Sequence, residues 1–104
     1  MAKVVLTEPA EFDLQDIDHY ISVNLCSPQA AKRITEGIIN VIKNLEYNPK
    51  RQPIINNSYL RRMQLRRIGF ANYNIFYYYD SGYDIVFIFR ILYNQSDWQS
   101  ILKM

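Results

Sequence analysis

The chain has little of what disulfide-bonded, metal-binding or membrane proteins depend on. Cys26 is its one cysteine and His19 its one histidine. These counts exclude an internal disulfide and any multi-cysteine or histidine-rich metal centre. The longest apolar run falls far short of the roughly 20 residues that a membrane-spanning helix needs. We therefore expect a protein that uses no metal or cofactor and does not enter the membrane.

The N-terminal stretch MAKVVLTEPAEF also lacks the features of a secretion signal. It holds one lysine, and its apolar run from Val4 to Thr7 is four residues long, whereas the apolar part of a signal peptide needs about 7–15 residues. The chain of 104 residues is 49% hydrophobic and 21% charged, as globular proteins are. We expect one cytoplasmic domain over residues 1–104 with a single core.

Charge is scarce in total but unevenly placed. The net charge is +2, yet residues 43–67 hold seven lysines and arginines against one acid, Glu46. Residues 8–18 hold five acids and no base. This asymmetry indicates either a cationic face that meets an anionic partner or a solvated surface with a dipole, and composition favours neither.

Two amphipathic helices are predicted in the first half of the chain. Each starts where a hydroxyl residue, Thr7 or Ser27, precedes a proline. Gly37 predicts close contact with a neighbour, most simply the first helix. The short break at Asn24–Ser27 predicts an antiparallel helical hairpin. Apolar residues recur at helical spacing at Ala10, Leu14, Ile17 and Ile21, and again at Ala31, Ile34, Ile38, Val41 and Leu45.

The second half of the chain follows the period of strands. After a predicted loop at 48–59, Arg61–Arg67 alternates: Met63 and Leu65 face the helices with Arg61 and Arg67, while Arg62, Gln64 and Arg66 face outward. Strands are also predicted at Lys3–Leu6, Tyr73–Tyr79 and Ile85–Tyr93, with a hairpin turn at Asp80-Ser81-Gly82 and a last helical turn after Asp97.

These elements predict a two-layer α+β fold. The order is β-α-α-β-β-β with a short C-terminal helix. Three consecutive strands form an antiparallel meander, the first strand joins the same antiparallel sheet, and the helical hairpin covers one face. The opposite face is then open, and the outward arginines lie on it.

Three stretches, in this order and spacing, resemble the RelE/ParE superfamily, the toxins of bacterial type II toxin–antitoxin modules that include plasmid-stabilisation systems. LTEPAEFDLQDIDHYI is similar to the opening strand and acidic helix of that superfamily. NYNIFYYYDSGYDIVFIFRIL is similar to its central hairpin, and NQSDWQSIL to its closing segment. The resemblance covers nearly the whole chain.

The resemblance implies a growth-inhibiting toxin that a cognate antitoxin inactivates. It also implies either a hetero-oligomer of toxin and antitoxin or a homodimer of the toxin. RelE-like members are mRNA interferases that cleave mRNA in the ribosomal A site. ParE-like members bind DNA gyrase and are not thought to cleave anything. An acidic or amphipathic antitoxin segment would suit the basic region 43–67. From this resemblance, ribosome-dependent mRNA cleavage is the first hypothesis for this chain, and non-catalytic inhibition of DNA gyrase is the alternative. A degenerate member that binds antitoxin but poisons nothing is a further alternative.

The RelE reaction needs a base, cations that stabilise the phosphorane, and an acid for the leaving oxygen. By position, the resemblance makes four residues the catalytic candidates: Arg62, Arg66, Arg90 and Tyr93. The match is partial, because Gln64 stands where RelE has a second lysine, and Asn74 where many ribonuclease members have an arginine. An asparagine donates a hydrogen bond but carries no charge.

A second set of residues is predicted to bind nucleic acid or a protein partner: Lys50, Arg51, Arg61, Arg67 and Trp98. Trp98 offers a ring for stacking. Arg90 interrupts an apolar central strand, so it needs either an anionic ligand or an internal salt bridge. Most of the tyrosines at 73–79, and Tyr93 itself, are more typical of packing than of catalysis.

Overall fold

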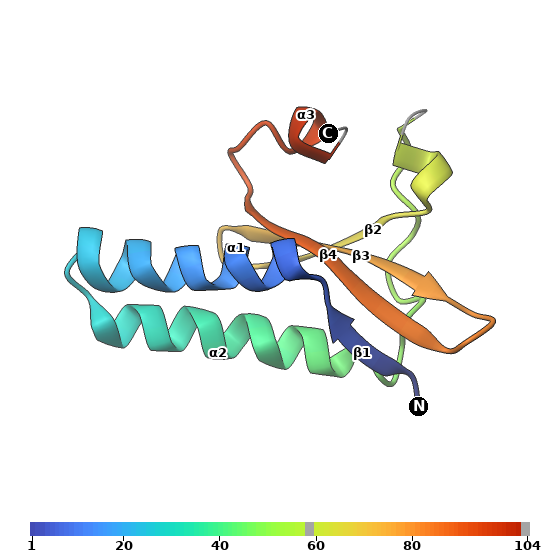
Figure 1. Ribbon diagram of the computed structural model, residues 1–104, viewed down its shortest axis with the longest axis horizontal. Coiled ribbons are helices and arrows are strands. Elements are labelled where there is room, and N and C mark those ends of the chain that lie inside the picture. The colour runs from blue at the N-terminus through green and yellow to red at the C-terminus, as the bar shows by residue number, and fades with distance from the viewer. Residues whose placement is uncertain (58–59, 103–104) are drawn as a thin grey trace.

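The computed structural model describes residues 1–57 and 60–102 of the chain. Two long helices, α1 and α2, lie side by side on one side of a twisted sheet, and α3 lies on the other side (Figure 1). The elements are β1 (Lys3–Leu6), α1 (Glu8–His19), the π-helical η1 (Tyr20–Asn24), α2 (Pro28–Asn44), the 3-10 helix η2 (Leu60–Met63), β2 (Arg66–Phe70), β3 (Tyr73–Asp80), β4 (Ile85–Tyr93) and α3 (Trp98–Leu102).

The predicted α+β fold and the order of its main helices and strands are confirmed, with a correction to the direction of β1. The strand order is β1-β4-β3-β2, and β2, β3 and β4 form the antiparallel meander. However, β1 pairs with β4 in parallel, so the sheet is mixed rather than antiparallel. The helical hairpin between β1 and β2 is long enough to return the chain to the other end of the sheet, which parallel pairing requires.

The start of α1 is joined directly to β4. The Thr7 hydroxyl oxygen accepts a hydrogen bond from the Ala10 backbone N–H at 3.3 Å, which is the predicted N-cap. The same hydroxyl donates to the carbonyls of Ile88 and Phe89, at 2.9 and 3.0 Å. The α2 start at Pro28 also agrees with the sequence, although Ser27 makes no side-chain cap hydrogen bond. Thr7 therefore fixes where α1 leaves the sheet.

Gly37 leaves room on α2 for a side chain of the sheet. A Cβ built at this glycine would lie 2.0 Å from the Phe70 ring, which comes from β2. The neighbour that requires a glycine is thus a strand residue, and the expected contact with the first helix is wrong. Which distant side chain packs against a helical glycine depends on the fold, and the spacing of residues in the sequence does not reveal it.

The predicted strand Arg61–Arg67 is wrong over its first half. Residues 60–63 form η2, Gln64 has a left-handed backbone with φ of 53°, and β2 starts only at Arg66. This change of backbone direction resets the alternation of side chains. Arg66 consequently faces the helix side and Arg67 the opposite side, the reverse of the prediction. The predicted loop precedes η2, and its residues 58 and 59 lie outside the described part.

Both faces of the sheet carry a hydrophobic cluster. The helix side holds the larger one, with Ile38 of α2 and Ile75, Tyr77 and Ile88 of the sheet fully buried. On the other side, Leu60, Leu65, Phe76, Leu92 and Leu102 form a second cluster with α3 and η2. The expectation of a single core and an open arginine face is therefore wrong, because short apolar segments from two distant parts of the chain cover much of that face.

None of the helices in the described ranges is long and apolar enough to cross a bilayer.

We predict that Gly37→Ala destabilises the fold. Overpacking against the Phe70 ring costs about 1–3 kcal/mol, and the higher helix propensity of alanine returns up to about 1 kcal/mol. Urea unfolding followed by circular dichroism should show a net loss, and adding Phe70→Leu should recover part of it. Gly69→Ala is the control, because a Cβ there meets nothing closer than 3.7 Å. Equal stability of wild type and Gly37→Ala would contradict the packing described above.

Candidate functional site: an arginine set and a tyrosine pocket

The positively charged binding candidates and the catalytic candidate Arg62 are solvent-exposed. Arg61 and Arg62 lie on η2, Arg67 lies near the start of β2, and Lys50 and Arg51 lie in the loop after α2. Each of these five side chains is exposed. These five side chains are thus open to solvent and accessible to an anionic partner.

Arg66 is oriented toward the helix side of the sheet and is only half-exposed. It lies opposite Tyr77 in the β2–β3 pairing, and its guanidinium donates a hydrogen bond to the Gln52 carbonyl oxygen. Burial raises the pKa of Tyr77, while the Gln52 backbone and the charges of Arg66 and Arg51 act in the opposite direction. Arg66 therefore ties the 48–57 loop to the sheet and does not lie beside Arg62.

Arg67 and Trp98 are brought together on the opposite side. The Arg67 guanidinium lies 5.2 Å from the centre of the Trp98 ring, which is a cation–π contact. The same ring packs against Phe76 at 5.2 Å. Two predicted binding residues thus form one cluster, whose structural effect is to hold α3 against the sheet.

Arg62 borders a cavity of about 530 Å³ between η2 and the sheet. Three aromatic residues form its sheet wall: Tyr78, Phe87 and Phe89. The Tyr78 and Phe87 rings stack with centroids 6.4 Å apart. We call this space the aromatic cavity. A cation beside half-exposed rings is an arrangement that holds a nucleobase and its phosphate, among other ligands.

Arg90 forms a bidentate salt bridge with Asp13 of α1. Its Nε and NH2 groups donate to the two carboxylate oxygens at 2.7 and 2.9 Å. The Asp13 carboxylate also accepts the Ile91 backbone N–H at 2.9 Å, on the edge of β4 that lies beyond the end of β1. The hydrogen bonds from Arg90 to Asp13, together with the charge of that carboxylate, raise the pKa of Arg90, although burial opposes them. The internal salt bridge that the sequence left open is thus the arrangement observed.

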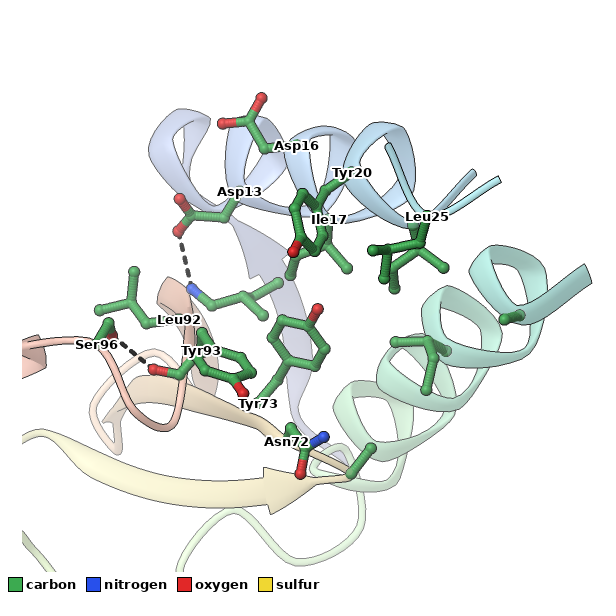
Figure 2. Close-up of a pocket in the computed structure, with 15 residues that line it drawn as sticks. Asp13, Asp16, Ile17, Tyr20, Leu25, Asn72, Tyr73, Leu92, Tyr93 and Ser96 are labelled. Atoms are coloured by element: carbon green, nitrogen blue, oxygen red, sulfur yellow. Dashed lines mark hydrogen bonds between the residues drawn. The ribbon is translucent and has the colours of Figure 1, made fainter. Parts of the chain in front are cut away.

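Tyr93 lies at the end of β4 and borders a larger pocket of about 690 Å³. This tyrosine pocket lies between the tip of the helical hairpin and the near end of the sheet (Figure 2). The Tyr93 ring meets Tyr73 edge-on, with centroids 5.8 Å apart. Burial raises the pKa of Tyr73, and the phenols of Tyr93 and Tyr20 raise it further. Three phenols from distant parts of the chain therefore gather at one pocket.

The four candidate catalytic residues occupy separate environments. Arg62 borders the aromatic cavity, Arg66 bonds the Gln52 carbonyl on the helix side, and Arg90 is held by Asp13. Tyr93 borders the tyrosine pocket. Asn74 is half-buried in β3, opposite Gly69 and Leu92. The structure does not gather the cations and the acid–base group that RNA cleavage would need around one phosphate.

Two features escaped the sequence reasoning. Asp13 is one of five acids in the first helix, and only the fold selects it as the partner of Arg90. The sequence did indicate that some anion must lie near Arg90, because an arginine within an apolar strand requires one. Tyr20 gave no signal, because its neighbours at the pocket come from β3 and β4, more than fifty residues later in the chain.

We predict that Asp13→Asn lowers the free energy of unfolding by about 1–3 kcal/mol, because Arg90 keeps its charge and loses its partner. Chemical denaturation measures the change. Asp16→Asn, an exposed acid on the same helix, is the matched control and should stay within about 0.5 kcal/mol of wild type. Combining Asp13→Asn with Arg90→Gln should cost less than the sum of the single changes; additive losses would contradict a direct interaction.

Comparison with known proteins gives a consistent result. A family model described as the ParE toxin of the type II toxin–antitoxin system parDE matches residues 4–98. No curated protein matches the chain in sequence.

Two solved structures have a similar fold. One is a chromosomal ParDE toxin–antitoxin system from P. aeruginosa, with a TM-score of 0.68 and 18% identity over 89% of this chain and 96% of that one. The other is the toxin–antitoxin complex RelBE2 from Mycobacterium tuberculosis, with a TM-score of 0.63 and 18% identity over 88% of this chain and 96% of that one. At such identities the likeness concerns the fold alone.

Proposed function

Because the chain belongs to the ParE toxin family of type II toxin–antitoxin systems, we propose that it arrests growth by binding DNA gyrase, without a catalytic step. The family expected from the sequence is thereby confirmed, and the target is the part that we propose. ParE-like members of the superfamily that the sequence resembles act in this way.

The observation that carries the proposal is the salt bridge of Arg90. An arginine that stabilises a phosphorane must present its guanidinium to the ligand. Both donors of Arg90 that make this pair are directed at Asp13, whose side chain is 11% exposed. Arg90 thus serves the fold, and a reaction that relied on it would first have to break the bidentate contact.

The remaining candidates add to the same argument. Asn74 lacks the charge of the arginine that many ribonuclease members carry there, and loss of one such donor typically costs about 10²- to 10³-fold in rate. Arg66 donates to the Gln52 carbonyl and is on the opposite side of the sheet from Arg67. A toxin that acts by binding alone needs no cluster of catalytic cations. The absence of a charge at Asn74 and the internal bond of Arg66 are therefore compatible with inhibition of gyrase.

A binding surface is available on the helical hairpin. Phe12 of α1 is 54% exposed and Val23 of η1 is 57% exposed, although both are apolar. A few well-packed side chains carry most of the binding energy at a protein interface, and exposed apolar side chains gain free energy when a partner covers them. We assign the contact with gyrase to this outer face and tip of the hairpin.

The same proposal includes a cognate antitoxin. The two similar structures are toxin–antitoxin systems or complexes. The exposed lysine and arginine side chains of the loop after α2 and of η2 can form charge-assisted hydrogen bonds with an acidic or amphipathic antitoxin segment. In this proposal the two proteins form a hetero-oligomer in the cytoplasm, where gyrase works.

We predict that the purified chain inhibits supercoiling by gyrase. Phe12→Ser combined with Val23→Ser should raise the concentration for half-inhibition by about tenfold or more, because it removes two exposed apolar side chains from the proposed contact. The assay follows the conversion of relaxed plasmid to the supercoiled form on a gel.

Two controls accompany this assay. Tyr83→Ser removes an exposed apolar ring from the β3–β4 turn, far from the hairpin in sequence and fold, and Arg62→Ala removes a charge from η2. Both should inhibit like wild type. Supercoiling that continues unchanged at a large molar excess of the wild-type chain would refute the proposed target.

A second candidate function is ribosome-dependent mRNA cleavage, and one observation favours it. Arg62 stands at the rim of the aromatic cavity, whose Tyr78, Phe87 and Phe89 side chains could stack a base. Primer extension on mRNA with purified ribosomes tests this alternative. We predict no cuts in the A site; cuts with the wild-type chain that disappear with Arg62→Ala would establish the second function in place of the first.

A further inference from the structure

The tyrosine pocket joins three parts of the chain that are distant in sequence. Tyr20 comes from η1, Tyr73 from the start of β3 and Tyr93 from the end of β4. Tyr20 and Tyr93 are 51% and 43% exposed, so their rings are available to a ligand. Figure 2 shows the Tyr20 and Tyr73 side chains extending toward each other across the pocket. The pocket thus has aromatic sides and an open mouth.

The charge around this pocket is negative. Asp13 and Asp16 border it, and none of the described residues that line it is a lysine, arginine or histidine. Asp13 is already paired with Arg90, so its charge is compensated. Asp16 is exposed, one helical turn before Tyr20, and contributes an anionic rim. A ligand with an anionic group would therefore be repelled at the mouth.

The floor of the pocket is apolar. Ile17 is buried there, and Leu25 and Ile34 are further lining residues. An apolar floor, aromatic sides and a carboxylate rim match a long side chain that carries a cation at the end of an apolar stem. The rings attract the cation through their quadrupoles, and phenol oxygens accept its N–H groups. Arginine and lysine have this composition.

We propose that the tyrosine pocket seats an arginine or lysine side chain of the cognate antitoxin, on a segment whose flanking residues are apolar. This inference rests on the proposed function, which supplies the antitoxin. The occupant follows from charge complementarity and from position. A segment seated here covers Leu25 at the hairpin tip, two residues from Val23, and thus obstructs the surface that we assign to gyrase.

This contact differs from the one expected at the basic loop and η2. At the basic loop and η2 the antitoxin presents acidic side chains to exposed arginines and lysines. At the tyrosine pocket it presents an arginine or lysine to Asp16 and the three tyrosine rings. The pocket and the basic loop lie at opposite ends of α2, because the pocket includes Ala30 and Ile34 near its start and Lys50 follows its end. One amphipathic segment with charges of both signs would then be held in a single direction along the toxin.

The test uses the protein encoded by the reading frame beside this gene, and isothermal titration calorimetry. Tyr20→Leu keeps an apolar side chain and removes the ring, and we expect the dissociation constant to rise about 5- to 30-fold. Asp16→Asn should raise it about 2- to 10-fold at low salt, and less at high salt, because the carboxylate is exposed.

Matched controls separate the pocket from general effects of charge and surface. Asp18→Asn removes an exposed acid from the same helix outside the tyrosine pocket, and Tyr83→Leu removes an exposed ring from the β3–β4 turn. Both should bind like wild type. Equal affinity for all four variants, or failure of the neighbouring protein to bind at all, overturns the inference.

A second measurement needs no antitoxin. N-acetyl-arginine amide, added at millimolar concentration, should shift the ring resonances of Tyr20, Tyr73 and Tyr93 in NMR spectra of the wild-type chain, and N-acetyl-norleucine amide should not. Equal shifts with both probes would mean an apolar pocket without cation preference, and would overturn the proposal. Neither result depends on gyrase, so a failure here and a failure of gyrase inhibition are separate findings.

Discussion

The Asp13 carboxylate joins the first helix to the sheet, and much of the structure depends on that junction. β1 pairs with β4 only as far as Ile88, which leaves the edge of β4 open beyond that residue. Asp13 accepts the Ile91 N–H at this edge and holds the guanidinium of Arg90 with both oxygens. Together with the Thr7 hydroxyl, which donates to the carbonyls of Ile88 and Phe89, it fixes α1 along β4. The Asp13 side chain thus accepts a backbone hydrogen bond at a part of the β4 edge that β1 does not cover.

This junction also explains the functional geometry. Because α1 is held along the end of β4, the tip of the helical hairpin extends past the sheet (Figure 1). Tyr20 of η1 therefore lies with Tyr73 and Tyr93 around the tyrosine pocket. The same pairing occupies Arg90 with an internal partner. Arg90, the arginine within the central strand, therefore joins β4 to α1. If the chain acts by binding, as we propose, this use of an arginine costs nothing in activity.

The sequence predicted the elements well wherever local chemistry decided them. Thr7 and Pro28 mark helix starts, and Ile85–Tyr93 is a strand with the predicted bounds, because caps and apolar runs act over a few neighbouring residues. The prediction was wrong at Arg61–Arg67, where the left-handed backbone of Gln64 and a 3-10 turn shifted the alternation by one position. That shift exchanged the faces of Arg66 and Arg67.

By itself, the sequence determined the α+β order, the helical hairpin, the meander and the resemblance to the RelE/ParE superfamily, since periodicity and motif order are properties of the linear chain. Only the tertiary structure decided that β1 runs parallel to β4, that Asp13 is the acid that binds Arg90, and that a second hydrophobic cluster covers much of the far face. These outcomes depend on which distant segments come into contact. Five acids lie within residues 8–18, and their spacing in the sequence does not show which of them will bind Arg90.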